Sequence, residues 1–100
     1  MSTVDIIRYR THPEKAEENQ KLVEAVFAEL AEKAPEGLRY MVFRLADGVS
    51  FTHLVISEEG GASLGDLTAF TQFTEGVGER AAVPPERVES TVVGSYGFLA

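Results

Sequence analysis

The sequence predicts a single α+β domain in which two helices cover one face of a four-stranded antiparallel sheet. Two runs rich in β-branched and aromatic residues flank Asp47-Gly48, which is typical of a hairpin. A long amphipathic stretch precedes this hairpin, and a shorter one follows it before a last β-type run. A chain of 100 residues can build one modest core, so residues 1–100 are expected to form one domain.

The first predicted strand covers Thr3 to Arg10. Side chains alternate across a strand, which gives one face with Val4, Ile6 and Arg8 and another with Asp5, Ile7 and Tyr9. Both faces carry apolar groups, so we expect both to be covered.

A long helix is predicted from Thr11-His12-Pro13-Glu14 to about Ala34. Proline is accepted in a first helical turn, and Thr11 with Glu14 has the spacing of a capping box. Apolar residues recur at spacings of three and four at Leu22, Val23, Val26, Phe27 and Leu30. Pro35 and Gly37 then end the helix.

The central hairpin runs from Gly37 to Ser57. A two-residue type I′ turn at Asp47-Gly48 would pair Arg44 with Phe51, Val42 with His53 and Tyr40 with Val55. One face is plainly apolar, with Met41, Phe43, Leu45, Leu54 and Ile56. The second face is mixed but not solvated, with Tyr40, Val42, Arg44, Phe51, His53 and Val55. The hairpin therefore needs cover on both sides.

A shorter helix is predicted from about Asp66 to Arg80, capped by Ser63 or Asp66. Gly76 and Gly78 lower its propensity, so a break or a mobile segment is expected. Val83-Pro84-Pro85 should end it, and the last strand is predicted from about Val88 to Phe98, with a bulge or a close neighbour at its glycines.

The predicted order is strand, helix, hairpin, helix, strand. With right-handed crossovers this is the βαββαβ, or ferredoxin-like, arrangement. Helices on one face leave the other apolar face open, and a second copy of the chain is the simplest cover because a two-fold interface is self-complementary. The sequence therefore predicts a homodimer through the sheet face, a dimeric α/β barrel. The apolar end Phe98-Leu99-Ala100 is expected to dock as well.

Composition excludes several kinds of partner and site. The net charge of −7 without a basic cluster argues against nucleic acid and anionic membranes. The chain has no cysteine, no metal-ligand spacing, no transmembrane run and no apolar signal-peptide core at MSTVDIIRYR. We expect a cytoplasmic protein without a metal or another cofactor.

The chain resembles the dimeric α/β-barrel proteins, in particular the antibiotic-biosynthesis-monooxygenase-like group. The likeness covers most of the chain and rests on VDIIRYR leading through Pro13 into a long helix, on Pro35-Glu36-Gly37-Leu38, and on LTAFTQFTEGV. The group includes cofactor-independent quinone-forming monooxygenases and haem-degrading enzymes. Several members use an asparagine and a tryptophan near the pocket, but this chain has no tryptophan, and Asn19 falls in the first helix. The resemblance therefore implies the fold and the dimer, and no catalytic residue.

The residues themselves offer one candidate catalytic cluster: His53, Tyr40 and Arg44. They share one hairpin face, where histidine could act as general base, tyrosine could orient a phenolic substrate, and arginine could stabilise an oxyanion. The competing interpretation is a histidine held by a hydrogen bond in the sheet or in a dimer interface. Weaker candidates for a ligand role are His12, Tyr9, Tyr96, Phe70 and Phe73.

Three functions are compatible with the sequence. One is a cofactor-independent monooxygenase-like enzyme acting on a small aromatic or polyketide-like compound in a pocket between sheet and helices. The alternative is a non-enzymatic dimeric small-molecule-binding or stress-associated protein, and haem binding is a third possibility.

Overall fold

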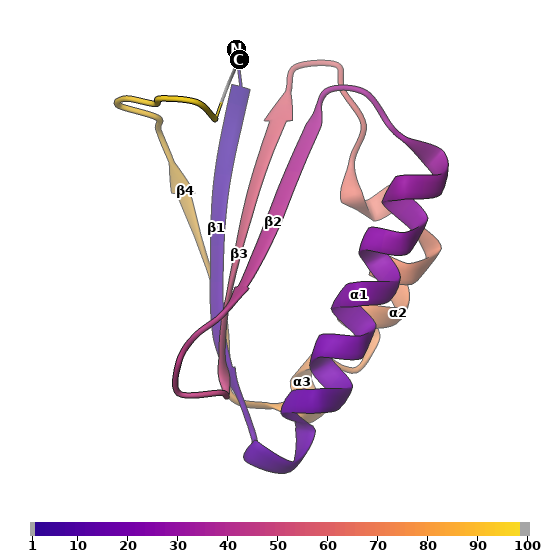
Figure 1. Ribbon diagram of the computed structural model, residues 1–100, viewed down its shortest axis with the longest axis vertical. Helices are drawn as coiled ribbons and strands as arrows, with labels where there is room; N and C mark the ends of the chain where they lie inside the picture. Colours follow the sequence, from indigo (N-terminus) through magenta and orange to yellow (C-terminus); the bar gives the residue numbers. More distant parts are fainter. Residues whose placement is uncertain (1, 99–100) are drawn as a thin grey trace.

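The computed structural model describes residues 2–98 and has the predicted two-layer architecture (Figure 1). The strands are β1 (Ser2–Thr11), β2 (Leu38–Arg44), β3 (Ser50–Glu58) and β4 (Ala81–Ser90). All pairings are antiparallel, and the strand order is β2-β3-β1-β4. The helical segments are η1 (Pro13–Lys15), α1 (Ala16–Lys33), η2 (Leu64–Asp66), α2 (Thr68–Glu75) and α3 (Val77–Arg80). The βαββαβ prediction is confirmed.

The helices lie together on one side of the sheet, and the core fills the space between the layers (Figure 1). The face of β3 that carries Phe51, His53 and Val55 is the buried one. This decides which hairpin face meets the helices: the mixed face is inside the subunit. Buried core residues are Tyr9, Val23, Val26, Phe51, Val55, Leu64, Leu67 and Phe73.

The hairpin has the predicted register but a different turn. Arg44 pairs with Phe51, Val42 with His53, and Tyr40 with Val55, as expected. The type I′ turn is wrong, because Gly48 has φ +78° while Asp47 does not have a positive φ. The Gly48 amide bonds the Leu45 carbonyl, and the Asp47 carboxylate accepts from the Val49 and Ser50 amides. The longer loop is symmetric about the same centre, so the register is unchanged.

The first helix begins later than predicted. Thr11 is the last residue of β1, and its hydroxyl donates to the Val49 carbonyl at 3.1 Å, so the capping box is wrong. Pro13 instead starts the short 3₁₀ turn η1, which leads into α1. The helix ends where predicted, with Ala34 in the left-handed region at φ 44°.

The second helix is broken at Gly76 into α2 and α3, as its glycines predicted. Ser63 caps η2 by accepting from the Gly65 amide, whereas the first amides of α2 donate to the carboxylate of Glu29 on α1.

Both predicted ends of the last strand, Val88 and Phe98, are wrong. Strand β4 covers Ala81–Ser90 and therefore includes Pro84 and Pro85. The pairing with β1 shifts between Arg8 and Arg10, at the position where these two prolines lie. Proline cannot donate to a ladder, but an edge strand with a bulge accommodates it. The predicted bulge glycines fall beyond this strand.

The sheet face away from the helices is open in the single subunit. Met41, Phe43, Leu45 and Val88 are exposed, at 40%, 47%, 44% and 37% of their surface. Phe98 lines a shallow groove on this face with Met41, Leu54 and Ile56. The rest of the predicted docking tail, Leu99-Ala100, lies outside the described residues. Within residues 2–98, no helix is long and apolar enough to cross a membrane.

Candidate functional site

A cavity of about 520 Å³ lies between the sheet and the segments η2, α2 and α3. This volume is in the range of small-molecule sites. Aromatic and aliphatic side chains dominate its wall, and Asp5 and Arg87 contribute charges. The lining residues are Asp5, Ile7, Tyr9, Tyr40, His53, Val55, Ser57, Ser63, Leu64, Gly65, Phe70, Phe73, Thr74, Val77, Pro85 and Arg87.

His53 is held between two tyrosines at one side of this cavity. Its Nε2 lies 2.9 Å from the hydroxyl oxygen of Tyr9, and its Nδ1 lies 2.6 Å from that of Tyr40. The three residues come from β1, β2 and β3, the neighbouring strands of the sheet. Both ring nitrogens therefore already have a hydrogen-bond partner within the subunit.

The hydrogen-bond chain continues from Tyr9 into the helical layer. The Asn19 amide nitrogen donates to the Tyr9 hydroxyl at 2.8 Å, and the Asn19 carbonyl oxygen accepts from Arg80 Nε at 3.0 Å. Arg80 also donates to the Phe73 carbonyl at 2.7 Å, and its guanidinium lies over the Phe73 ring. Asn19 and Arg80 are both buried. Asn19 of α1 and Arg80 of α3 thus hold the end of the hydrogen-bond chain that lies away from Tyr40.

Burial determines the charge of the central residues. It lowers the pKa of His53 to about 4, because the protonated ring would lose its hydration. It raises the pKa of Tyr9 to about 12, against the lowering effects of Asn19 and Arg80, and it raises the pKa of Tyr40 as well. At neutral pH the imidazole and both phenols are uncharged.

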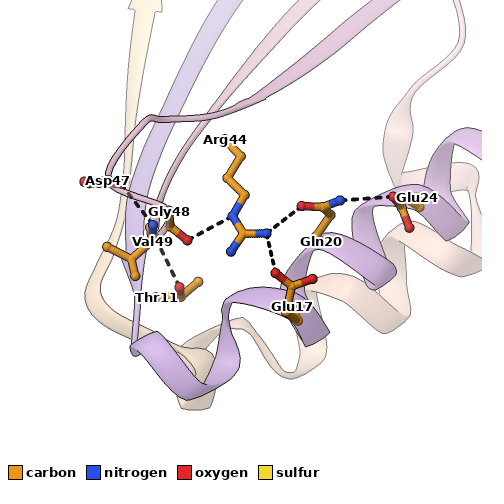
Figure 2. A network of polar contacts seen from close by, with 8 residues as sticks. All are labelled: Thr11, Glu17, Gln20, Glu24, Arg44, Asp47, Gly48 and Val49. Carbon is orange, nitrogen blue, oxygen red and sulfur yellow. Dashed lines mark hydrogen bonds and ion pairs between the residues drawn. The ribbon is translucent and has the colours of Figure 1, made fainter.

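The structure brings two of the three predicted catalytic residues together. His53 and Tyr40 are hydrogen-bonded and line the cavity, whereas Arg44 does not line it. Figure 2 shows the Arg44 guanidinium bound to the Gly48 carbonyl and to Glu17 and Gln20 of α1. The long side chain extends toward the end of the strand, so this placement gives no support to the oxyanion role predicted for Arg44.

The weaker candidates separate in the same way. Phe70 and Phe73 line the cavity, and Tyr9 bonds His53. His12 precedes η1 and lies outside the cavity lining, while Tyr96 is exposed. Within residues 2–98, no group of three or more His, Cys, Asp or Glu side chains is arranged to hold a metal ion.

Sequence reasoning missed Asn19 and Arg80 as parts of the site. A signal existed for Asn19, because Ala16, Asn19, Val23 and Val26 follow helical spacing and are the buried residues of α1. An asparagine within such a stripe indicates a buried polar contact. Arg80 gave no comparable signal, since it is the last residue of the short α3 and an arginine at a helix end is ordinarily exposed.

Known structures share this fold at low sequence identity. A protein of Mycobacterium tuberculosis, Rv0793, superposes with a TM-score of 0.76 at 16% identity, over 95% of this chain and 98% of that one. A proposed antibiotic biosynthesis monooxygenase of Nitrosomonas europaea gives 0.74 at 15%, over 92% and 90%. SnoaB of Streptomyces nogalater, a cofactor-independent oxygenase whose structure was determined for a point mutant, gives 0.68 at 13%, over 96% and 97%.

The chain has the fold of the antibiotic-biosynthesis-monooxygenase-like proteins. This confirms the resemblance noted in the sequence at the level of architecture. No family model and no curated protein sequence matches the chain. Identities of this size show a shared fold and no shared chemistry.

Proposed function

We propose that this protein is a cofactor-independent monooxygenase that acts on a small aromatic or polyketide-like compound bound in the cavity. The observation that carries the proposal is the Tyr9–His53–Tyr40 cluster on the wall of an otherwise largely apolar cavity of about 520 Å³. Such a cavity favours planar, apolar ligands, and its convergent polar groups favour one ligand oxygen in a fixed place. The fold likeness to a cofactor-independent oxygenase supports the same class.

The proposed reaction needs no added reductant, because the substrate supplies the electrons. An aromatic ketone with an activated methylene group, of the anthrone type, forms its enolate when one methylene proton passes to water in the cavity. The enolate reacts with O₂ so that the methylene carbon becomes a carbonyl group. One oxygen atom enters the product, and the two hydrogens lost from carbon leave with the other oxygen atom as water.

Within this proposal, Tyr40 and His53 act as a pair. Tyr40 is half-buried and lines the cavity, whereas His53 has 3% of its surface exposed. The Tyr40 hydroxyl would meet the oxygen of the substrate, and His53 would hold that hydroxyl in place. Hydrogen bonding to the ionised form of a group lowers its pKa, so this contact would favour the enolate.

Oxygen uptake with anthrone as substrate tests the proposal. Wild-type protein is expected to consume one O₂ per anthrone and to yield anthraquinone. His53→Gln is expected to lower the rate by on the order of a hundredfold, because Tyr40 loses the partner that holds its hydroxyl against the developing oxyanion. His12→Gln makes the same change at the other histidine, outside the cavity, and should react like wild type.

Two outcomes would contradict the enzyme proposal. Unchanged turnover in His53→Gln would remove His53 from the mechanism. Saturable binding of anthrone without oxygen uptake would favour the alternative, a non-enzymatic binding protein. That alternative also has an observation in its favour, since both His53 nitrogens are already bonded to tyrosines.

We further propose that the protein is a homodimer through the open sheet face. The face that the sequence marks as plainly apolar is the one that the helices leave uncovered, and it includes Met41, Phe43 and Leu45. Contiguous apolar surface of this kind is typical of an interface between chains. A two-fold axis would place the same patch on both sides.

A further inference from the structure

The hydrogen-bond chain from Arg80 to Tyr40 has a direction, and that direction starts at Arg80. A guanidinium has donors and no acceptor. The Asn19 atom that it bonds is therefore the carbonyl oxygen, and the Asn19 amide nitrogen is left to donate to the Tyr9 hydroxyl oxygen. The Tyr9 oxygen is thus already an acceptor before His53 is considered.

Neutral His53 can complete this hydrogen-bond chain in two ways, because its single ring proton lies either on Nδ1 or on Nε2. With the proton on Nδ1, the Tyr9 hydroxyl donates to Nε2, and Nδ1–H donates to the Tyr40 oxygen. The Tyr40 hydrogen is then free to bond a ligand. With the proton on Nε2, Tyr40 donates to Nδ1 and the Tyr9 oxygen accepts a second bond. The Tyr9 hydrogen is then the free one.

Burial distinguishes the two arrangements. Tyr9 has 4% of its surface exposed, and within residues 2–98 its hydroxyl bonds Asn19 and His53 alone. A free Tyr9 hydrogen would be a buried donor without an acceptor, which is unfavourable because the group loses its bond to water and gains none in the protein. Both tyrosines line the cavity, but Tyr40 is half-buried whereas Tyr9 is buried, so the Tyr40 hydrogen is the one better placed to reach water or a ligand.

We propose that Arg80 and Asn19 are positioning residues that hold His53 as its Nδ1–H tautomer, so that Tyr40 donates its hydroxyl hydrogen to an acceptor oxygen of the ligand. This rests on the proposed function and specifies its substrate. The ligand presents a carbonyl, enolate or phenolate oxygen to Tyr40. The oxyanion-stabilising donor is then Tyr40, in place of Arg44.

The histidine tautomer can be measured directly by NMR. Nitrogen-15 shifts and two-bond couplings of the imidazole ring show which nitrogen carries the proton, and His12→Gln identifies the second histidine of the chain. The expected result for the wild-type protein at about neutral pH is a His53 proton on Nδ1. A proton on Nε2 in the wild type would overturn the proposal. This measurement is made on the wild-type protein and needs no substitution at the site.

Asn19→Asp is expected to reverse the direction of the hydrogen-bond chain, because it replaces an amide by a carboxylate of nearly the same shape. The carboxylate introduced at this position would pair with Arg80 and accept from the Tyr9 hydroxyl, since a carboxylate has no donor. Tyr9 would then accept from His53, which moves the ring proton to Nε2 and turns the Tyr40 hydrogen inward. A folded Asn19→Asp protein that keeps the Nδ1 proton would contradict the role of Asn19.

Ligand binding tests the second half of the proposal. The probe is 1,4-naphthoquinone, whose carbonyl oxygens only accept. Tyr40→Phe and Asn19→Asp are each expected to weaken its binding about 3- to 10-fold, the value of one lost neutral hydrogen bond. Tyr40→Phe should keep the Nδ1 proton, because Tyr9 still donates to Nε2.

The results separate this proposal from the proposed function. A reversed tautomer in Asn19→Asp with unchanged quinone affinity would refute Tyr40 as the ligand contact. Absence of oxygen uptake with anthrone would refute the monooxygenase. The tautomer and the quinone affinities would still test the roles of Asn19 and Tyr40, because neither measurement depends on turnover.

Discussion

At the scale of single residues, the most consequential feature is a neutral histidine in a buried polar chain. His53 donates and accepts between two tyrosines, and burial lowers its pKa to about 4 from the ordinary 6.5. The folded protein therefore disfavours the protonated ring, whereas the unfolded chain takes up the proton freely.

This difference predicts a pH dependence of stability. Between about pH 6.5 and pH 4 the unfolded state binds more protons than the folded state, so the free energy of unfolding falls as the pH falls. The contribution of His53 is fully present above pH 6.5 and decreases by on the order of 3 kcal/mol by about pH 4. Urea denaturation at about pH 7 and pH 5 measures it.

His53→Gln provides the comparison, since it cannot titrate. Carboxylates with lowered pKa, such as those of Asp47 and Glu29, also lose their contribution in acid, but they are common to both proteins. The variant should lose about 2 kcal/mol less than wild type between the two pH values. Equal losses would show that His53 is not held neutral by the fold.

Alternation along the strands allowed His53 and Tyr40 to be placed on one face, and that prediction is confirmed. The same reasoning put Arg44 on this face but could not say where so long a side chain would end. Asn19 and Arg80 belong to different helical segments, and their meeting depends on how those segments pack. Periodicity within one element does not contain that information.

At the scale of elements, the approach of Gly37 to Gly61 joins the start of β2 to the loop after β3. The Glu58 amide bonds the Gly37 carbonyl, and a Cβ atom on Gly37 would lie 2.9 Å from the Gly61 Cα. Gly48, at the other end of the hairpin, has the same left-handed backbone but nothing within 4 Å of such an atom.

This pair allows strain and steric overlap to be separated. Gly48→Ala is expected to cost about 1 kcal/mol, from the positive φ alone. Gly37→Ala carries the same strain and also forces two backbone segments apart, so we expect about 2–4 kcal/mol. Equal midpoints in urea denaturation would contradict the close packing of the two loops.

Helices and strands could be predicted from the sequence where the signal lies within a few neighbouring residues. The hairpin register and the broken second helix could be derived from turn and propensity signals. The last strand could not, because Pro84 and Pro85 are ordinarily incompatible with a ladder. They are accepted here because β4 lies at the sheet edge and bulges opposite β1, which only the assembled sheet determines.

At the scale of the whole molecule, the two sheet faces differ in what covers them. The mixed face and the segments η2, α2 and α3 line the cavity, and the plainly apolar face stays exposed in one subunit. The architecture was predictable because the element order and face pattern agree. A single subunit leaves the apolar face without a partner, which is the basis of the proposed dimer.

Phe43→Glu tests that dimer. Phe43 is 47% exposed in the subunit, so a charge there should leave the fold intact and prevent burial against a second copy. Sedimentation analysis should give a dimer for wild type and a folded monomer for the variant. Ala28→Glu adds the same charge on the exposed side of α1 and should remain dimeric. A monomeric wild-type protein would refute the proposed interface.

The most direct test of the central claim is a crystal structure of the protein with 1,4-naphthoquinone bound. We expect the ring against Phe70 and Phe73 and one quinone oxygen within hydrogen-bonding distance of the Tyr40 hydroxyl, with His53 still between its two tyrosines. A quinone bound elsewhere while this cavity stays empty would contradict the assignment of the site. So would a quinone in the cavity whose oxygens are turned away from Tyr40.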